Sequence, residues 1–261
     1  MEPIRVVVRG ASGRMGQEVI SAVSGTPGLE LVGAVDLEPP PNTLKLSDGS
    51  SIPFSADLEY LLAEQKPDVL VDFTVAGAVM PAVRAALRHG VRPVIGTSGL
   101  KPEEISEIDQ LAREYGLAAA LVPNFALGAV LMMHMAKVAA RYLDCAEIIE
   151  QHHPAKLDAP SGTAIATAEG MLKARGKPFS KPLTRESQSR GQDYGGIAVH
   201  SLRLPGIVAR QEVIFGGPGE TLSIKHDSVD RKCFMPGVIL AIREIGKHEG
   251  LVFGLDGLLG L

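Results

Sequence analysis

The chain has 261 residues, of which 45% are hydrophobic and 21% charged, and its formal net charge is −4. This composition is typical of a globular protein with room for a large core, and the lack of a basic run argues against a nucleic-acid or anionic-membrane partner. Two cysteines without CxxC spacing, a strand-like start and no apolar stretch of bilayer length favour a cytoplasmic protein without disulfides or a membrane span.

The first half of the chain alternates between short apolar runs and amphipathic segments. We expect strands over residues 4–8, 29–35, 69–74, 94–96 and 117–122. Helices are expected between them over residues 15–23, 76–89 and 102–115, and a loop over residues 36–50. This alternation predicts an α/β fold that begins with a Rossmann-like, doubly wound parallel sheet.

A glycine-rich turn, GASGRMG, joins the first strand to the first helix. Its glycines, Gly10, Gly13 and Gly16, have a GxxGxxG spacing related to the GxGxxG dinucleotide fingerprint. Such glycines allow a tight turn, a close approach of the backbone to a pyrophosphate, and close packing of helix on sheet. Asp36 ends the second strand, where a carboxylate can bind the adenosine ribose. The pattern predicts a dinucleotide site; the alternative is a glycine-rich turn without a ligand.

The residues around this turn bear on the choice of cofactor. Asp36 followed by Leu37 favours the free ribose hydroxyl of NADH. Arg9 and Arg14 flank the turn and could meet the 2′-phosphate of NADPH. We therefore expect NADH, with NADPH also accepted.

Two later turns follow strands at the ends where open α/β sheets bind ligands. They are Gly96-Thr97-Ser98 and Pro123-Asn124-Phe125. These turns could hold the nicotinamide carboxamide and its ribose. They could equally be ordinary turns, because all these residue types except Phe favour turns.

The second half of the chain has a different pattern. Helices are expected over residues 127–143, 164–174 and 236–245, with a long polar loop over 180–194. Strands are expected over residues 146–150, 197–202, 207–215, 221–226 and 251–253, with a hairpin turn at 216–220. This predicts an α+β C-terminal domain with an open, mainly antiparallel sheet, whose bare face favours a homo-oligomer. We expect residues 1–124 and 234–261 to form the dinucleotide-binding domain and 125–233 the substrate-binding and oligomerisation domain.

The stretch EQHHPAKLDAPSGTA, residues 150–164, gathers groups that bind anions and move protons. His152 and His153 end an expected strand, so their side chains should point to opposite sides of it. Lys156 follows on a loop and can provide a positive charge or a proton. An imidazole titrates near neutral pH. This set suits a small anionic substrate, especially a carboxylate, that needs proton transfer.

The end of this stretch predicts a helix N-terminus. Ser161 is the expected N-cap, and the N–H groups of Gly162 and Thr163 would then form an anion cradle. Asp158 is interpreted as a residue that braces the loop. We expect no metal, because there is no HExxH motif and no cluster of cysteines. Two less specific interpretations stay open, namely a solvated Lys156 and a histidine pair that belongs to a zinc site.

Seven segments spread along the chain resemble one enzyme family, the bacterial 4-hydroxy-tetrahydrodipicolinate reductases, formerly called dihydrodipicolinate reductases. The segments are VVRGASGRMG, VDFT, VIGTSG, VPNFALGAVL, EIIEQHHPAKLDAPSGTA, ETLSIKHDSVDR and FMPGV. The histidine–lysine–SGT segment is highly specific, whereas the glycine turn alone is not.

The resemblance implies functional residues at matching positions. The dinucleotide would be held by Gly10, Ala11, Ser12, Gly13, Arg14, Met15 and Asp36. Its nicotinamide end would be held by Gly96, Thr97, Ser98, Val122, Pro123, Asn124 and Phe125. The proton-transfer pair would be His152 and Lys156, and the substrate carboxylates would be bound by His153, Gly162 and Thr163.

The resemblance also implies the reaction and the assembly. A cyclic dicarboxylate imine of the diaminopimelate route to lysine would lose water, or arrive already dehydrated, to give a conjugated C=C–C=N system. This system would receive a hydride at C4 from NADH or NADPH and a proton at C3. Lys156 would be the proton donor, with His152 supporting proton exchange, in a homotetramer joined through the second-domain sheets. The chain departs from some family members at Leu37, where they have a basic residue, and at Gln211, where many have histidine.

Two other functions are alternatives to this one. The first is a two-domain dehydrogenase that oxidises a sugar or polyol, and the second is a non-catalytic sensor that binds NADH and signals through its oligomer. The dense set of proton-transfer residues in residues 150–164 argues against both.

Overall fold

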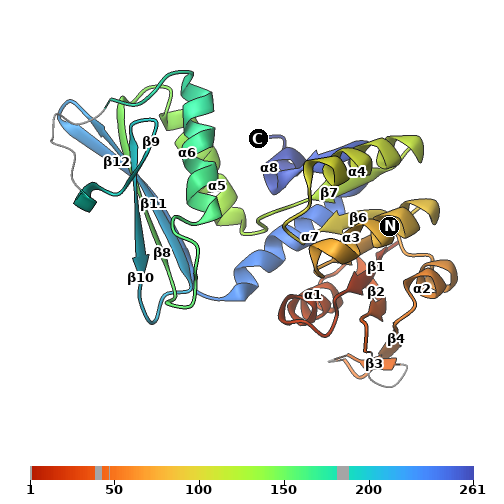
Figure 1. Cartoon of the computed structure of the whole chain (residues 1–261). Coiled ribbons are helices and arrows are strands. Elements are labelled where there is room, and N and C mark those ends of the chain that lie inside the picture. Colours follow the sequence, from red (N-terminus) through yellow and green to blue (C-terminus); the bar gives the residue numbers. More distant parts are fainter. Residues whose placement is uncertain (1, 39–42, 47, 181–187) are drawn as a thin grey trace. The chain divides into compact units, whose positions relative to one another are not determined.

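The computed structural model describes residues 2–38, 43–46, 48–180 and 188–261, and its chain divides into two compact units (Figure 1). Unit 1 comprises Met1–Phe125 and Arg231–Leu261, and unit 2 comprises Ala126–Asp230. The end of the chain therefore returns to unit 1. Each unit has its own hydrophobic core.

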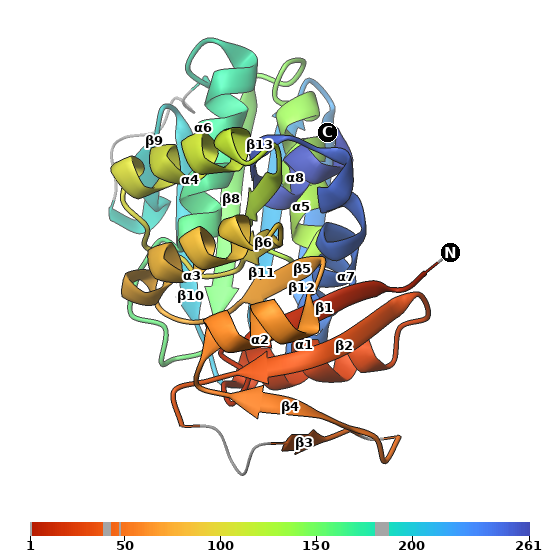
Figure 2. The same cartoon turned by 90° about the vertical axis from the view of Figure 1, so that its right-hand side faces the viewer.

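Unit 1 contains an eight-stranded sheet in the order β13-β7-β6-β5-β1-β2-β4-β3 (Figure 2). All neighbouring strands are parallel except β3 and β4. The strand order reverses at β1, which places a ligand crevice at the carboxyl ends of the central strands. The strands are β1 (Ile4–Arg9), β2 (Leu29–Val35), β3 (Thr43–Lys45), β4 (Ser51–Ser55), β5 (Val69–Asp72), β6 (Arg92–Ile95), β7 (Ala118–Leu121) and β13 (Gly250–Phe253).

Two groups of helices pack on this sheet. One group is α2 (Leu58–Gln65), α3 (Ala76–Arg88) and α4 (Pro102–Glu114). The other is α1 (Arg14–Ser24), α7 (Met235–Glu244) and α8 (Gly254–Leu259), with the short 3-10 helices η2 (Arg231–Phe234) and η3 (Ile245–Lys247). Val7 packs in the core beneath α2 and α3, while its neighbours Val6 and Val8 are fully buried on the opposite face. Burial on both faces explains why β1 is a continuous apolar run.

Unit 2 contains a five-stranded sheet in the order β12-β11-β8-β10-β9. The central β8 pairs antiparallel with β11 and parallel with β10, and the two remaining pairs are antiparallel. The strands are β8 (Cys145–His152), β9 (Gln192–Tyr194), β10 (Ile197–Arg203), β11 (Ala209–Gly217) and β12 (Glu220–Ser228). Figure 1 shows α5 (Leu127–Ala139) and α6 (Gly162–Arg175) along one face of this sheet, and the core lies between them and the sheet.

The predicted fold class is confirmed: a Rossmann-like parallel sheet is followed by an α+β part with a mainly antiparallel sheet. Among the described residues, no helix is long and apolar enough to cross a bilayer. The hairpin predicted at 216–220 is present, because β11 pairs antiparallel with β12. The strand β10 pairs with β8 rather than with β11, because β8 occupies the centre of the sheet.

The two loop expectations were partly wrong. Within residues 36–50, Thr43–Lys45 forms β3, which pairs with β4 at the edge of the sheet. Within residues 180–194, Gln188–Arg190 forms the 3-10 helix η1 and Gln192–Tyr194 forms β9. Edge strands of three residues carry too few side chains to show a period of two. Residues 39–42, 47 and 181–187 of these loops lie outside the described part of the chain.

Candidate functional site

The glycine turn after β1 has the geometry that a dinucleotide cradle requires. Gly10 has a φ of +78°, and a Cβ there would lie 2.6 Å from the carbonyl oxygen of Phe73. A Cβ on Gly16 would lie 2.1 Å from the carbonyl oxygen of Gly10, so α1 approaches the turn as closely as backbone allows. Both positions therefore require glycine. No side chain caps the N-terminus of α1, and its first N–H groups stay available to an anion.

Asp36 lies beside this turn at the end of β2. Its carboxylate accepts hydrogen bonds from the backbone N–H of Ser12 at 2.8 Å and of Leu37 at 2.8 Å. These bonds tie the carboxylate to the rim of the cradle, where a ribose hydroxyl would be recognised. Ala11 is buried behind it and donates its N–H to the carbonyl oxygen of Val35 at 3.2 Å.

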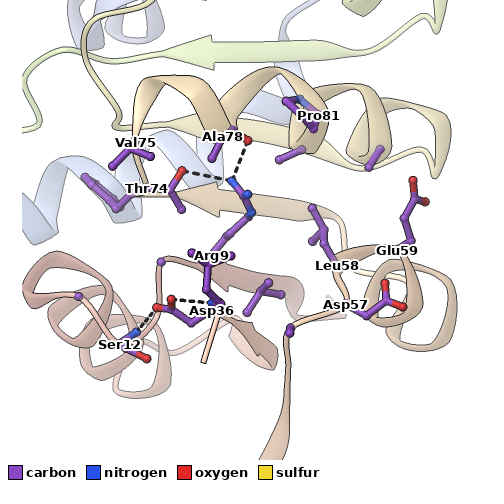
Figure 3. Close-up of a pocket in the computed structure, with 18 residues that line it drawn as sticks. Arg9, Ser12, Asp36, Asp57, Leu58, Glu59, Thr74, Val75, Ala78 and Pro81 are labelled. Atoms are coloured by element: carbon purple, nitrogen blue, oxygen red, sulfur yellow. Dashed lines mark hydrogen bonds between the residues drawn. The ribbon is translucent and has the colours of Figure 1, made fainter. Parts of the chain in front are cut away.

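A pocket of about 920 Å³ opens next to the turn, and Figure 3 shows its lining. It includes the turn, the end of β2 and the starts of α2 and α3. The lining residues are Arg9, Gly10, Ser12, Gly13, Val35, Asp36, Leu37, Ala56, Asp57, Leu58, Glu59, Phe73, Thr74, Val75, Ala78, Pro81, Ala82 and Ala85. Its size and its apolar walls with a few polar groups suit the adenosine half of a dinucleotide.

The other predicted dinucleotide residues follow neighbouring strands at the same edge of the sheet. Gly96–Ser98 follow β6, and Val122–Phe125 follow β7, which pairs with β6 in parallel. The predicted dinucleotide residues follow β2, β1, β6 and β7. These strands belong to a row of five adjacent strands, from β2 to β7, that is about 19 Å wide at the usual strand spacing. The edge therefore has the length to hold an extended dinucleotide. Arg14 is exposed, Met15 is half-buried, and neither lines the pocket.

Asp72 is a residue of this edge that the sequence interpretation left without a role. It is 1% exposed, and its carboxylate accepts hydrogen bonds from Arg9 Nη1 at 2.7 Å and from the backbone N–H and hydroxyl of Thr74 at 2.9 and 2.6 Å. The hydroxyl of Thr97 lies at 3.3 Å. Asp72 thus connects the turns after β5 and β6. The signal that could have found it is a carboxylate at the end of an apolar strand.

The second group of predicted residues lies in unit 2, on the loop between β8 and α6. His152 is the last residue of β8, and its side chain is 16% exposed. His153 is exposed, and its carbonyl oxygen accepts the N–H of Lys156 at 3.1 Å. The Nζ of Lys156 lies 2.8 Å from the carboxylate of Asp158. The expectation that Asp158 braces the loop agrees with this contact.

The side chain of Glu150 makes the hydrogen bonds that hold this loop in place, and no function was predicted for this residue. Its side chain is fully buried. One oxygen lies 2.6 Å from Nδ1 of His152 and accepts from Arg203 Nη1 at 3.0 Å. The other oxygen accepts from Arg203 Nη2 at 2.9 Å and from the N–H of Ser161 at 3.2 Å. A hydroxyl hydrogen bond from Ser201 adds to these.

Arg203 extends this contact to the rest of the loop. Besides Glu150, its guanidinium donates to the carbonyl oxygens of Lys156 at 3.3 Å and Asp158 at 2.6 Å. One side chain therefore holds the loop backbone on both sides of Leu157, which is itself exposed. A planar guanidinium with five donors is suited to several simultaneous contacts of this kind.

The N-terminus of α6 begins where the sequence predicts an anion cradle. Ser161 is the N-cap, and its hydroxyl oxygen accepts the N–H of Ala164 at 3.3 Å, which confirms the cap. The N–H groups of Gly162 and Thr163 are in the first turn, where a helix leaves its donors without partners. A Cβ on Gly162 would meet nothing within 4 Å, so the cradle is open.

A polar chain supports the first turn of α6. The hydroxyl of Thr167 donates to the carbonyl oxygen of Thr163 at 2.7 Å, and it accepts from Nε2 of Gln211 at 2.8 Å. Gln211 is 5% exposed, and its Oε1 has no hydrogen-bond partner among the described residues. Gln211, where the chain departs from the family pattern, is therefore connected to the first turn of α6 through Thr167.

The electrostatics of the loop set the charge of its histidine. Burial lowers the pKa of His152 below 6.5; the charges of Lys156 and Arg203 act in the same direction, and Glu150 opposes them. Burial acts to raise the pKa of Glu150, but hydrogen bonds from Arg203, Ser201 and His152 outweigh it, so this pKa is lowered. At neutral pH, Glu150 is therefore ionised and His152 is neutral. Within the described part of the chain, no group of three or more His, Cys, Asp or Glu side chains could hold a metal ion.

The parallel sheet and the glycine turn are those of a nicotinamide-dependent oxidoreductase. Two family models match the chain: "Dihydrodipicolinate reductase, N-terminus" over residues 4–125 and "Dihydrodipicolinate reductase, C-terminus" over residues 128–259. The chain belongs to the dihydrodipicolinate reductase family, as its sequence resemblance predicted.

Individual relatives agree with the family models. The chain is 57% identical to a 4-hydroxy-tetrahydrodipicolinate reductase from Dehalococcoides mccartyi, with both chains fully covered. It is 46% identical to an enzyme of the same name from Moorella thermoacetica, with 98% of each covered. Its structure is similar to a dipicolinate-bound dihydrodipicolinate reductase from Paenisporosarcina sp. TG-14, with a TM-score of 0.89, 39% identity, and coverage of 97% of this chain and 98% of the other.

Proposed function

We propose that this protein reduces 4-hydroxy-tetrahydrodipicolinate to tetrahydrodipicolinate with NADH or NADPH, in the diaminopimelate route to lysine. The observation that carries the proposal is the loop of unit 2. In a member of the reductase family, it holds His152 and the start of α6 on the buried carboxylate of Glu150, with Lys156 on the same loop beside Asp158. Family membership also disfavours the polyol dehydrogenase and the nucleotide sensor.

Unit 1 is the dinucleotide-binding domain in this proposal. The N–H groups at the start of α1 bind the pyrophosphate, and Asp36 binds the adenosine ribose. The turns Gly96–Ser98 and Val122–Phe125 bind the nicotinamide end. The cofactor supplies the hydride that is added to the substrate at C4. The glycine positions and the pocket fit this group, because side chains at Gly10 or Gly16 would close the cradle.

Unit 2 is the substrate-binding domain. The N–H groups of Gly162 and Thr163 bind one substrate carboxylate, and the exposed His153 binds the other. A dipicolinate-bound relative has the same fold, which supports a cyclic dicarboxylate as the ligand. The 4-hydroxy substrate loses water, or arrives already dehydrated, and so forms a conjugated C=C–C=N system. Hydride adds at C4 of this system, electrons move to the ring nitrogen, and the resulting enamine is protonated at C3. Lys156 provides this proton, and the neutral His152 accepts and returns protons.

The test is a coupled assay with substrate made in situ from pyruvate and aspartate semialdehyde by the synthase. We expect NADH or NADPH oxidation at 340 nm that depends on the synthase, on both precursors and on this protein. Folded protein that binds NADH but oxidises neither cofactor would contradict the proposal. NADH formation from a polyol would instead support the dehydrogenase alternative.

We further propose that NADH is the preferred cofactor. Next to Asp36, the pocket is lined by the exposed Leu37 and by Asp57 and Glu59. Figure 3 shows Arg9 turned toward Thr74 and Ala78, and its Nη1 is also bonded to Asp72. Among the described lining residues, three side chains are acidic and one, that of Arg9, is basic. Arg9 already has the carboxylate of Asp72 as a partner. A 2′-phosphate would meet net negative charge here.

Titrations of NADH and NADPH, followed by nicotinamide fluorescence, test this preference without turnover. We expect the Kd for NADPH to exceed that for NADH by about tenfold or more, which corresponds to ~1.4 kcal/mol. Leu37→Arg should strengthen NADPH binding, while the uncharged control Leu37→Gln should not. Equal affinities in the wild-type protein, or no response to Leu37→Arg, would contradict it.

The assembly is proposed to be a homotetramer joined through the sheets of unit 2, in the cytoplasm. The face of this sheet that α5 and α6 cover buries Ile148 and Val213 completely. On the opposite face, Ile149 and Ile214 are only half-buried, and Leu202 is 36% exposed. Light scattering on the purified protein should give four times the 27.5 kDa chain mass. A monomer would contradict the proposal.

A further inference from the structure

We propose that Glu150 is a positioning residue that fixes His152 in the tautomer with its proton on Nδ1, and so leaves the Nε2 lone pair as a proton acceptor. Glu150 would thus determine which ring nitrogen of His152 can accept a proton. The tautomer is a property of the free protein. Only its catalytic consequence rests on the proposed function.

The geometry around Glu150 supports this role. Its four recorded contacts come from two nitrogens of Arg203, one ring nitrogen of His152 and the backbone N–H of Ser161, at 2.6 to 3.2 Å. Three of the four are obligate N–H donors: they occupy both lone-pair sites of one oxygen and one site of the other, whose second site faces His152. Burial acts to raise the pKa of Glu150, but the hydrogen bonds from Arg203 and Ser201 help to lower it. The carboxylate is therefore ionised and accepts at every position.

The tautomer follows from this arrangement. Because Glu150 only accepts, Nδ1 of His152 must donate across the 2.6 Å contact. A neutral imidazole has one hydrogen on its two ring nitrogens. Because Nδ1 carries it, Nε2 has none and presents a lone pair. A carboxylate that holds an imidazole by Nδ1 acts in the same way in other proton-transfer sites.

The charges near His152 keep it neutral in this arrangement. Glu150 acts to raise the pKa of His152, whereas Lys156 and Arg203 lower it together with burial. Asp158 faces Lys156 and partly offsets its charge. Since Arg203 also binds the carbonyl oxygens of Lys156 and Asp158, the Glu150–Arg203 pair couples the loop backbone to the histidine. Removal of Glu150 should therefore change both the tautomer and the proton affinity of His152.

Nitrogen-15 NMR of histidine-labelled, ligand-free protein tests the proposal directly. The signal of His152 among the seven histidines is assigned from a His152→Asn variant. In the wild-type protein we expect the proton on Nδ1. In Glu150→Gln we expect a mixture of tautomers, because an amide can donate as well as accept. We also expect the pKa of His152 to fall further, since the charge that raised it is gone and Arg203 is unbalanced.

The direction of the pKa change separates positioning from unfolding. A loop that merely loosens exposes His152, and its pKa then rises toward 6.5. Glu147→Gln is the matched control, because Glu147 lies on the same strand and contacts His200 and Arg190 instead. It should leave His152 unchanged. If Glu150→Gln is too unstable, Glu150→Gln/Arg203→Gln removes the unpaired buried cation and should still give mixed tautomers.

The kinetic consequence is a loss of kcat/KM of about 10- to 100-fold in Glu150→Gln, the range seen when the partner that orients a functional histidine is removed. Glu150→Asp keeps the charge and should recover part of this loss. A proton on Nε2 in the wild-type protein, or an unchanged tautomer in folded Glu150→Gln, would overturn the proposal. A normal tautomer in a protein without reductase activity would leave this inference standing and refute the proposed function.

Discussion

The two units present different chemical groups to their proposed ligands. Unit 1 forms its cradle mainly from backbone, namely the glycine turn and the first N–H groups of α1, with Asp36 as one fixed carboxylate. Unit 2 builds its site from titratable side chains around Glu150, with His152 and Lys156 close by. Backbone donors do not titrate, whereas the pKa values of His152 and Glu150 depend on their surroundings. Cofactor binding should therefore tolerate changes that abolish proton transfer.

The largest expected effect comes from removal of the proton donor. Lys156→Ala should lower kcat by about 10²- to 10⁴-fold, the usual contribution of a positioned acid. The Kd for NADH should stay within about twofold, because the cofactor cradle lies in the other unit. Steady-state kinetics and NADH titrations on the same preparation measure both. An unchanged kcat would remove Lys156 from its role.

The complementary experiment changes the glycine turn of unit 1 and leaves the loop of unit 2 unchanged. A Cβ at Gly16 would overlap the carbonyl of Gly10, so the turn must move, at a cost of about 1–3 kcal/mol. Gly16→Ala should weaken NADH binding by about 10- to 100-fold in a fluorescence titration. Gly246→Ala is the matched control, since a Cβ there meets nothing within 4 Å. Similar Kd values for both variants would show that the turn does not hold the cofactor.

Substrate binding by the helix N-terminus gives a smaller effect. We expect the hydroxyl of Thr163 to donate to the same substrate carboxylate as the backbone N–H groups. Thr163→Ala removes this hydrogen bond and keeps the backbone donors, so the KM for substrate should rise up to roughly tenfold with little change in kcat. Thr163→Ser retains the hydroxyl and should behave like the wild-type protein. A fall in kcat at constant KM would instead place Thr163 in the proton-transfer machinery.

Acidification should affect unit 2 before unit 1. Burial lowers the pKa of His226 as well as that of His152, so the unfolded chain binds more protons than the folded one below pH 6.5. Stability must then fall as the pH decreases from 6.5 through the folded pKa values. Glu150, with a pKa lowered from 4.5, stabilises the fold above that pH and loses this contribution as the pH falls through its folded value.

Thermal unfolding and kcat/KM, both measured between about pH 7.5 and 5.5, test this order. Both should decline while the Kd for NADH stays nearly constant. His152→Asn is the control, and its stability should depend less on pH over this range. An NADH affinity that falls in parallel with kcat/KM in the wild-type protein would contradict the contrast between the units.

The smallest expected effect is at Gln211. Gln211→Leu loses one hydrogen bond to Thr167 but also removes a buried oxygen without a partner, so the net change in unfolding free energy should be about 1 kcal/mol or less. Urea unfolding measures it, and KM should rise less than twofold. Gln211→Met is a second apolar replacement of similar length. A large loss of activity in either variant would show that Gln211 contributes more than support for Thr163.

Local patterns in the sequence predicted most of the elements that position the site, but not β4 and α2, although the start of α2 lines the pocket. The GxxGxxG spacing identified the turn after β1, and Ser161 identified the start of α6, because each depends on residues close together in the chain. The resemblance supplied the roles of His152 and Lys156. The parallel and antiparallel sheets followed from apolar runs and period-two segments.

The contacts that organise the site could not be predicted in this way. Glu150 and Arg203 are 53 positions apart and meet because β10 pairs with β8, a register that local pattern does not determine. Asp72 likewise forms an ion pair with Arg9, which lies 63 positions away on the neighbouring strand. A buried carboxylate could have been suspected from its apolar strand, but its partners required the fold.

The double variant His152→Ala/Lys156→Ala tests the division of function between the two units most directly. NADH binding and substrate-dependent NADH oxidation are measured on one preparation, with the wild-type protein beside it. We expect a wild-type Kd for NADH together with a loss of oxidation of at least about 10²-fold. A double variant that still oxidises NADH at the wild-type rate, or one that is folded but no longer binds NADH, would contradict it.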